Sequence, residues 1–204
     1  MIKNVIFDIG GVIVHFKKET YFDYFNLGPR EKRSLTKTIF SPTWEKLSTG
    51  KIGTIDFKRY ALNAKPKYAA TIRKVLDKNN LKYMIPVNKT TMSYIQLIRS
   101  RGLKTYVLSD IEPNTIWYVE NEIPNFKESF DGISYSCRTG MLKRKGKVFD
   151  YILKRFHLNP EETLFIDDKE KNLVQAQLRK IKTYKFIDDG KDFEKIDAII
   201  NEEK

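Results

Sequence analysis

Apolar and polar positions follow three successive patterns along the 204-residue chain. Val5, Ile6 and Phe7 form a short continuous apolar run, which is typical of a buried strand, so we predict a strand over residues 3–7. Between residues 16 and 83 the apolar residues recur at helical spacing without a strand-like run, which predicts several short helices joined by turns. After Pro86 helical and strand-like patterns alternate to the end of the chain.

The alternating part predicts a regular series of elements. In chain order we expect a helix over 88–102, a strand over 104–108, a helix over 113–120, a strand over 133–136, a helix over 147–156, a strand over 163–166, a helix over 171–179, a strand over 183–187 and a last helix from residue 193. This alternation indicates an α/β fold with a parallel sheet and helices on both of its faces.

Ligands in such sheets bind outside the carboxyl ends of the strands. Asp8, Ser109 and Asp167 all stand at predicted strand ends of this kind. Asp8 is also followed at once by Gly10 and Gly11, which give the backbone freedom to turn. A charged group buried at a strand end is costly unless another group pairs with it. The partners that the sequence offers for Asp8 are Ser109, Lys143, Asp167 and Asp168.

Composition changes this picture little. Apolar residues make up 41% of the chain and charged residues 31%, which is ordinary for a globular protein. Cys137 is the only cysteine, so no internal disulfide forms, and we predict a reducing, cytoplasmic location. The first residues read as a strand rather than a signal peptide. No stretch approaches the roughly 18 apolar residues that a membrane span needs, so we expect no membrane partner.

The formal net charge of +12 raises the question of nucleic-acid binding. The excess is mostly lysine, dispersed along amphipathic segments without an arginine-rich tract or a nucleic-acid-binding motif. We therefore do not expect a nucleic-acid partner. A positively charged surface also attracts small anionic substrates, which is the use that we retain. We expect a monomer or a weak homodimer.

Four ordered motifs resemble those of the haloacid dehalogenase superfamily: VIFDIGGV at residues 5–12, VLSD at 107–110, GMLK at 140–143, and LFIDD at 164–168 followed by Asn172. The resemblance extends over the whole chain. It implies a Rossmann-like three-layer core formed by residues 1–15 and 85–204, with residues 16–84 as a small inserted helical cap. The chain further resembles sugar-phosphate (glucose-1-phosphate) phosphatases that have glycine two residues after the nucleophile.

The resemblance also implies a role for each residue. Asp8 would attack phosphorus and form an aspartyl phosphate. Mg²⁺ would be the cofactor, with oxygen ligands from Asp8, the Gly10 carbonyl group, Asp168 and, directly or through water, Asp167. Lys143 would neutralise nucleophile and phosphate. Ser109 and Asp110 would take part in phosphate binding, and Asn172 would orient the lysine or the carboxylates. A carboxylate at position 110 would oppose a bound phosphate unless it is paired.

Each role has a competing explanation. The pair Asp167 and Asp168 is also a suitable cap for the following helix. Four other cations surround Lys143 in sequence and compete with it for the same role: Arg138, Arg144, Lys145 and Lys147.

Gly10 is a departure from the superfamily, because most phosphatases of this type have an aspartate there that protonates the leaving group. General acid-base catalysis of this kind accelerates a reaction by roughly a hundredfold to ten-thousandfold. Three functions therefore compete: a magnesium-dependent phosphatase acting on a small phosphorylated metabolite such as a sugar phosphate, a haloacid dehalogenase that needs no metal, and a catalytically weak phosphate-binding regulator. The acidic pair favours the first.

Overall fold

The computed structural model describes residues 1–202 and contains a five-stranded parallel sheet. The strands lie in the order β3-β2-β1-β4-β5. Their bounds are Asn4–Phe7 for β1, Lys104–Ser109 for β2, Gly132–Tyr135 for β3, Thr163–Asp167 for β4 and Lys182–Lys185 for β5. The predicted α/β fold class is confirmed.

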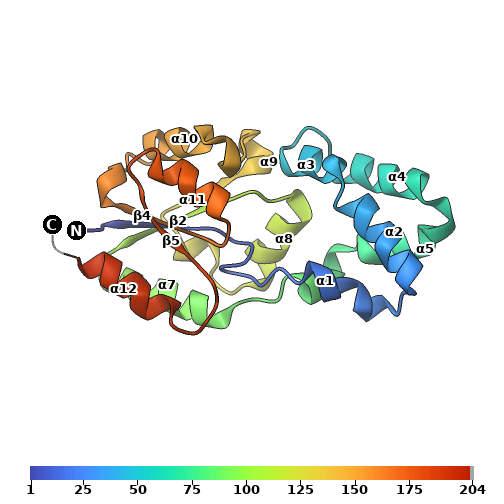
Figure 1. The fold of residues 1–204 in the computed structure, drawn as a ribbon, viewed down its shortest axis with the longest axis horizontal. Helices are drawn as coiled ribbons and strands as arrows, with labels where there is room; N and C mark the ends of the chain where they lie inside the picture. Colours follow the sequence, from blue (N-terminus) through green and yellow to red (C-terminus); the bar gives the residue numbers. More distant parts are fainter. Residues whose placement is uncertain (203–204) are drawn as a thin grey trace.

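Successive side chains of each strand point to opposite faces of the sheet, and helices cover both. Val5 and Phe7 pack into one cluster together with α7 (Lys89–Ser100) and α12 (Asp192–Asn201). Ile6 packs into the other with α10 (Lys147–Arg155) and α11 (Glu170–Gln177). Figure 1 shows these helix pairs on opposite sides of the sheet. The result is the three-layer arrangement that alternation of helix and strand predicts.

The central strand β1 pairs with β2 on one side and β4 on the other. Phe7 is in register with Val107 of β2 and with Ile166 of β4. These three strands therefore end at the same edge of the sheet. Asp8, Ser109 and Asp167 meet there because each stands at the end of its strand.

Residues 16–84 contain helices and no strand, as the periodicity predicts. Their elements are α1 (Lys18–Tyr21), η1 (Phe22–Phe25), α2 (Pro29–Ile39), α3 (Pro42–Ser48), α4 (Thr54–Ala64), η2 (Pro66–Tyr68), α5 (Ala69–Val75), η3 (Lys78–Asn80) and α6 (Leu81–Met84). In Figure 1 this segment forms the right half of the molecule, away from both termini. We call residues 16–84 the helical segment.

The chain enters and leaves the helical segment through two connections that lie side by side. Val14 forms an antiparallel bridge with Val87, and the backbone N–H of His15 donates to the carbonyl oxygen of Pro86 at 2.9 Å. The Asn88 N–H donates to the Ile13 carbonyl oxygen at 2.9 Å. These backbone bonds hold the two crossings together.

The helical segment contacts the sheet end a second time, at the short helix α9 (Ser136–Thr139). The Ser136 hydroxyl group donates to the carbonyl oxygen of Ser48, at the end of α3. Gly50 follows with a φ of +69°, and a Cβ atom there would lie 2.2 Å from the Cys137 carbonyl oxygen. Only glycine fits this close approach without displacement of the backbone.

The structure corrects some predicted bounds. The strand expected over 133–136 ends at Tyr135, because Ser136 begins α9. The last strand ends at Lys185 rather than at 187. The sequence prediction missed α9 and the short 3-10 helices η4 (Lys127–Ser129), η5 (Lys143–Lys145) and η6 (Pro160–Glu162). The expected helix over 113–120 is α8 (Pro113–Glu122). Among residues 1–202, no helix has the length and apolar character that crossing a bilayer requires.

Candidate active site

Asp8 is buried at the start of the loop that follows β1. Its backbone N–H still donates to Ile166 of β4, at 2.9 Å, so the sheet fixes its position. One carboxylate oxygen, Oδ1, accepts the Ile9 N–H at 2.7 Å. The other, Oδ2, lies 2.7 Å from the Lys143 ammonium nitrogen. The aspartate is thus held in one orientation by its own loop and by a distant lysine.

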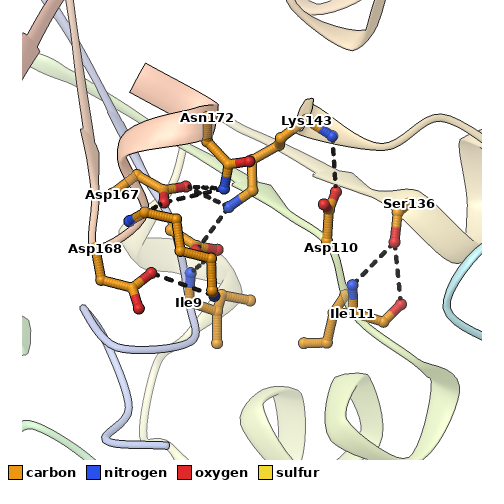
Figure 2. Close-up of polar contacts among 10 residues, drawn as sticks. Ile9, Asp110, Ile111, Ser136, Lys143, Asp167, Asp168 and Asn172 are labelled. Carbon is orange, nitrogen blue, oxygen red and sulfur yellow. Dashed lines mark hydrogen bonds and ion pairs between the residues drawn. The ribbon is translucent and has the colours of Figure 1, made fainter. Parts of the chain in front are cut away.

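Lys143 is 1% exposed and lies between two carboxylates. Its Nζ atom is 2.7 Å from Asp8 Oδ2 and 2.6 Å from Asp167 Oδ2. Figure 2 shows the lysine reaching from η5 toward the end of β4. A buried ion pair needs close geometry and further hydrogen bonds to offset the cost of desolvation. Both carboxylates make such additional bonds to backbone N–H groups.

Asp167 is fully buried and receives donors from several directions. The Asn172 side-chain NH₂ lies 3.0 Å from each of its two oxygens, and the Lys169 backbone N–H donates to Oδ1 at 2.8 Å. Asn172 stands in the first turn of α11, one turn beyond the strand end, which brings its amide back to the carboxylate. The predicted orienting role of Asn172 therefore has a concrete target in Asp167.

The two paired carboxyl groups have pKa values shifted in opposite directions. Burial opposes ionisation of Asp8, but the positive charges of Lys143 and Lys169 outweigh it and lower the pKa. Burial and the neighbouring Asp8 charge raise the pKa of Asp167 to about 6. Burial also disfavours the charged form of Lys143, yet the facing carboxylates raise its pKa above the ordinary value. Two acids thus compete for one buried cation.

Asp168 brings a third carboxylate to the same place. Ligand atoms of Asp8, Asp167 and Asp168 all lie within 4.8 Å of one another. Asp168 Oδ1 is buried and has no hydrogen bond, and its charged neighbour is the Lys169 Nζ atom at 3.3 Å. Gly11 makes room for this side chain, because its φ is +84° and a Cβ there would lie 2.7 Å from Asp168 Cγ. An all-oxygen set that includes a buried oxygen without a hydrogen bond fits a hard divalent cation.

The end of β2 contributes Ser109 and Asp110. Ser109 is buried, and its hydroxyl group helps to lower the pKa of Asp8 by hydrogen bonding. Asp110 accepts the backbone N–H of Lys143 at 3.0 Å through Oδ1 (Figure 2). The carboxylate is therefore paired and fixes the loop that carries the lysine. Its predicted part in phosphate binding stays a prediction.

A cavity of about 280 Å³ opens onto this cluster. Its wall includes Asp8, Gly10, Ser109, Lys143 and Asn172. The opposite wall comes from the helical segment, through Phe16, Trp44, Glu45 and Ser48. Asp8 and Lys143 thus face a space that is lined by both parts of the molecule.

The structure decides among the candidate cations. Of the five basic residues weighed in this stretch, Lys143 alone is buried among the carboxylates. Arg144 pairs with Glu45 of the helical segment, with Nη2 and Oε2 2.6 Å apart, and Arg138 Nη2 lies 3.8 Å from Glu120. Neither touches Asp8. The glycine at 140, which takes a left-handed conformation (φ 72°), sets the turn that leads to the lysine.

Sequence reasoning missed Lys169. Its ammonium group is close enough to Asp8 to lower that residue's pKa, and it borders the cavity. Burial by itself would lower the pKa of Lys169. The facing carboxylates, Asp8 above all, outweigh this effect and raise the pKa above its ordinary value. Its position directly after the acidic pair was a usable signal. A cation next to two carboxylates at a strand end is placed to share their site.

The chain belongs to the haloacid dehalogenase-like hydrolase family, whose model matches residues 2–176. It is 28% identical to the sesquiterpene phosphatase astK of Aspergillus oryzae, over 86% of this chain and 85% of that one. It is 27% identical to the D-ribitol-5-phosphate phosphatase of Bacteroides thetaiotaomicron, over 85% and 86% of the two chains. Among solved structures, a family enzyme of B. thetaiotaomicron in complex with magnesium and inorganic phosphate resembles it with a TM-score of 0.76 at 21% identity, covering 91% of this chain and 94% of that one.

Proposed function

We propose that this protein is a phosphatase that hydrolyses a small phosphomonoester with the help of Mg²⁺, through an aspartyl phosphate on Asp8. The observation that carries the proposal is the cluster of Asp8, Asp167 and Asp168, in which Asp8 and Asp167 share the buried Lys143 and Asp8 borders a cavity. Two relatives that span most of this chain are named as phosphatases, which supports the same reaction class.

The metal site would be formed by the carboxylates of Asp8, Asp167 and Asp168 and by the Gly10 carbonyl group. Bound there, Mg²⁺ would neutralise the negative charge of the phosphate and of the carboxylates that surround it. The solved relative that contains magnesium and phosphate supports this cofactor. The buried Asp168 Oδ1 atom, which has an ion-pair partner in Lys169 but no hydrogen bond, is a feature of this chain that fits a cation.

The protein's own groups account for two balanced steps. In the first, a carboxylate oxygen of Asp8 forms a bond to phosphorus while the bond from phosphorus to the leaving oxygen breaks. In the second, water attacks the aspartyl phosphate, which releases inorganic phosphate and restores the carboxylate. Lys143 would stabilise the negative charge that develops on the phosphate oxygens, and Ser109 would donate a hydrogen bond to them.

Gly10 leaves the leaving group without an acid from this loop. A Cβ atom at Gly10 would meet no atom within 4 Å, so space for an acidic side chain exists but is not used. The departing oxygen would therefore take its proton from solvent. This chemistry favours substrates whose leaving oxygen needs little protonation.

The substrate itself is less constrained. The sequence resemblance predicts a sugar phosphate, while the names of the two relatives indicate chemically dissimilar substrates, a sesquiterpene and a polyol phosphate. The second candidate, dehalogenation without metal, would leave the Asp167 and Asp168 carboxylates with their lysine partners and without a metal ion. The third, a phosphate-binding regulator, would keep the cluster for binding alone.

We also propose that the helical segment, residues 16–84, is a cap domain on a core of residues 1–15 and 85–204. The paired connections at Val14 and Val87 support this division. The cap would close the cavity, and the Glu45–Arg144 ion pair would break when it opens. If the two connections and the cap had the same position in phosphate-free and phosphate-bound crystals, the proposed opening and closing of the cap would be wrong.

The test is release of inorganic phosphate from a panel of phosphomonoesters and haloacids, with Mg²⁺ and with a chelator. Wild-type protein is compared with Asp8→Asn, and thermal unfolding checks that the variant is folded. We expect magnesium-dependent release that the variant loses. Halide release without magnesium would favour the dehalogenase, and phosphate binding without turnover would favour the regulator.

A further inference from the structure

The helical segment encloses a second cavity, of about 370 Å³, that holds none of the catalytic carboxylates. This volume lies within the range of roughly 300–1,000 Å³ that is typical of small-molecule sites. Its inner wall is built from buried apolar side chains of several cap helices, among them Ile39, Leu47, Phe57, Val75, Leu81 and Met84. A cap that only had to cover the active site would gain stability by filling this space.

The second cavity adjoins the first. Trp44 and Glu112 contribute to the walls of both. The Trp44 ring packs at 5.5 Å, centroid to centroid, against Phe57 and against Phe40, and it stands in the wall that the two cavities share. A molecule whose phosphate lies at Lys143 would therefore direct the rest of its structure along Trp44 toward the apolar cavity.

The apolar cavity has little free hydrogen-bonding capacity in its interior. The Tyr21 hydroxyl group already donates to the Val75 carbonyl oxygen, at 2.7 Å. The buried Glu112 carboxylate accepts the backbone N–H groups of Asn114 and Thr115, each at 2.7 Å, as the cap of α8. A polyol entering here would give up hydrogen bonds to water without equivalent replacement, which costs free energy for every unpaired hydroxyl group.

The entrance has a different character from the interior. Lys58, Arg73 and Lys78 border it and are exposed, and Ile55 beside them is 75% exposed although it is fully apolar. Cations around an apolar opening attract an anion with a hydrophobic body.

We propose that the substrate is a phosphate monoester with an apolar body, an aromatic ring system or an aliphatic chain, which occupies the cap cavity while its phosphate lies at Asp8 and Lys143. This inference rests on the proposed phosphatase function and specifies its substrate. Specificity then comes from the hydrophobic effect in the cap, where each buried methylene group tightens binding by about fourfold.

The first experiment measures kcat/KM with Mg²⁺ for 2-(2-naphthyl)ethyl phosphate and decyl phosphate, and for glycerol 3-phosphate and glucose 6-phosphate. All four are esters of primary alcohols, so their leaving oxygens need similar protonation and the comparison reports on the body of the substrate. We expect the two apolar esters to exceed the two polar ones by at least about a hundredfold, and their ratio distinguishes the aromatic from the aliphatic body. Equal or higher kcat/KM for the polar esters would overturn the proposal.

A variant sharpens this test. Leu76→Trp fills the cavity from a half-buried position of its wall, whereas Leu62→Trp adds the same bulk to the cap outside that wall. We expect Leu76→Trp to raise KM for the apolar esters at least tenfold and to leave kcat/KM for glycerol 3-phosphate within about twofold. Leu62→Trp should leave all four substrates unchanged. A uniform loss in both variants would contradict a specific role for the cavity.

Binding of alkylphosphonates to the wild-type protein separates this inference from the phosphatase proposal. Their C–P bond is not hydrolysed, so calorimetry on butyl, hexyl, octyl and decyl phosphonate measures the cavity without turnover. We expect the dissociation constant to fall with each added methylene group until the cavity is full. No dependence on chain length overturns the cavity inference, whereas chain-length dependence without phosphate release from any ester, 4-nitrophenyl phosphate included, overturns only the proposed phosphatase function.

Discussion

Two clusters of charged side chains lie at opposite ends of the same sheet, and they are built differently. At the amino ends of β2 and β3, Asp131 accepts Arg99 at 2.6 Å, Lys104 at 3.1 Å and the Thr105 backbone N–H at 3.0 Å. Its side chain is 20% exposed, so water completes its solvation. At the carboxyl ends, the buried Asp8 and Asp167 share the buried Lys143, and Asp168 brings a third carboxylate close to them.

The difference lies in the ratio of cations to acids. Asp131 has two cations to itself, and although burial opposes ionisation, the bonds from Thr105, Lys104 and Arg99 lower its pKa. At the other end Asp8 and Asp167 share Lys143, and the pKa of Asp167 rises to about 6. An ion cluster with every acid paired stabilises a fold. A cluster with more buried carboxylates than cations favours the binding of another positive charge.

Lys143→Met is expected to have the largest effect, because it removes the one buried cation from the acidic cluster. We expect phosphate release to fall to background and the free energy of unfolding to fall by about 3–5 kcal/mol. Urea unfolding with and without Mg²⁺ measures the loss of stability, and magnesium should restore part of the lost free energy of unfolding.

Lys104→Met is the matched control at the other end of the sheet. Lys104 is 63% exposed, so the change should cost at most about 1 kcal/mol and leave turnover intact. If the two lysine variants lost the same amount of stability, the contrast between the clusters would be wrong.

Gly10→Asp tests the missing acid. A Cβ atom at position 10 meets nothing within 4 Å, so the substitution should be tolerated. We expect kcat for alkyl phosphates to rise by about a hundredfold, since general acid catalysis accelerates a reaction by roughly that much or more. The kcat for 4-nitrophenyl phosphate should change little, because its leaving oxygen needs little protonation.

Gly11→Asp is the steric control for that variant. It has the same charge one residue further along, but the left-handed backbone and the contact with Asp168 oppose it. It should lose both stability and activity. A Gly10→Asp variant that is folded and no faster on any alkyl phosphate would show that position 10 does not face the leaving group.

Asp131→Asn tests the structural cluster through pH. An acid whose pKa is lowered by folding stabilises the protein above its unfolded pKa, about 4, and this stabilisation is lost as the pH falls through the lower folded pKa. At pH 7 the variant should be about 1–3 kcal/mol less stable, because its donors lose a charged acceptor. Below pH 4 the difference should shrink. Urea unfolding at pH 7 and pH 3 measures both, and a difference that does not vary with pH would contradict the assignment.

Lys169→Met should have the smallest effect, because this lysine is half exposed at the edge of the acidic cluster. Its ammonium group lies 3.3 Å from Asp168 Oδ1, where it would compete with a metal ion. We expect KM for the phosphate ester to rise a few-fold while magnesium binds a few-fold more tightly. Calorimetry and initial rates give the two readouts, with the distant Lys180→Met as control. Weaker magnesium binding would contradict the competition.

The sequence was most informative where a pattern repeats. Alternating helices and strands predict the sheet and place Asp8, Ser109 and Asp167 at strand ends, which is why motifs far apart in the chain could be expected to meet. The pairing of Asp110 with the Lys143 backbone could not be predicted, because it depends on the conformation of a loop rather than on a period.

The helical segment was less predictable than the rest of the chain. Helical spacing indicates that residues 16–84 are helical, but not how far the short helices stay apart, and the apolar cavity depends on those separations. Trp44 illustrates the limit, since it packs among the cap aromatics and also borders both cavities. Packing and substrate contact are not alternatives for such a residue.

The two crossings at Val14 and Val87 leave the core side by side and are joined by backbone bonds that do not depend on side-chain identity. Both ends of the helical segment are therefore fixed at one place, whatever the length or sequence of the chain between them. A segment joined in this way can change in length or packing in evolution without a change in its points of attachment, provided that the contacts of Glu45, Ser48 and Gly50 with the sheet end are kept or replaced.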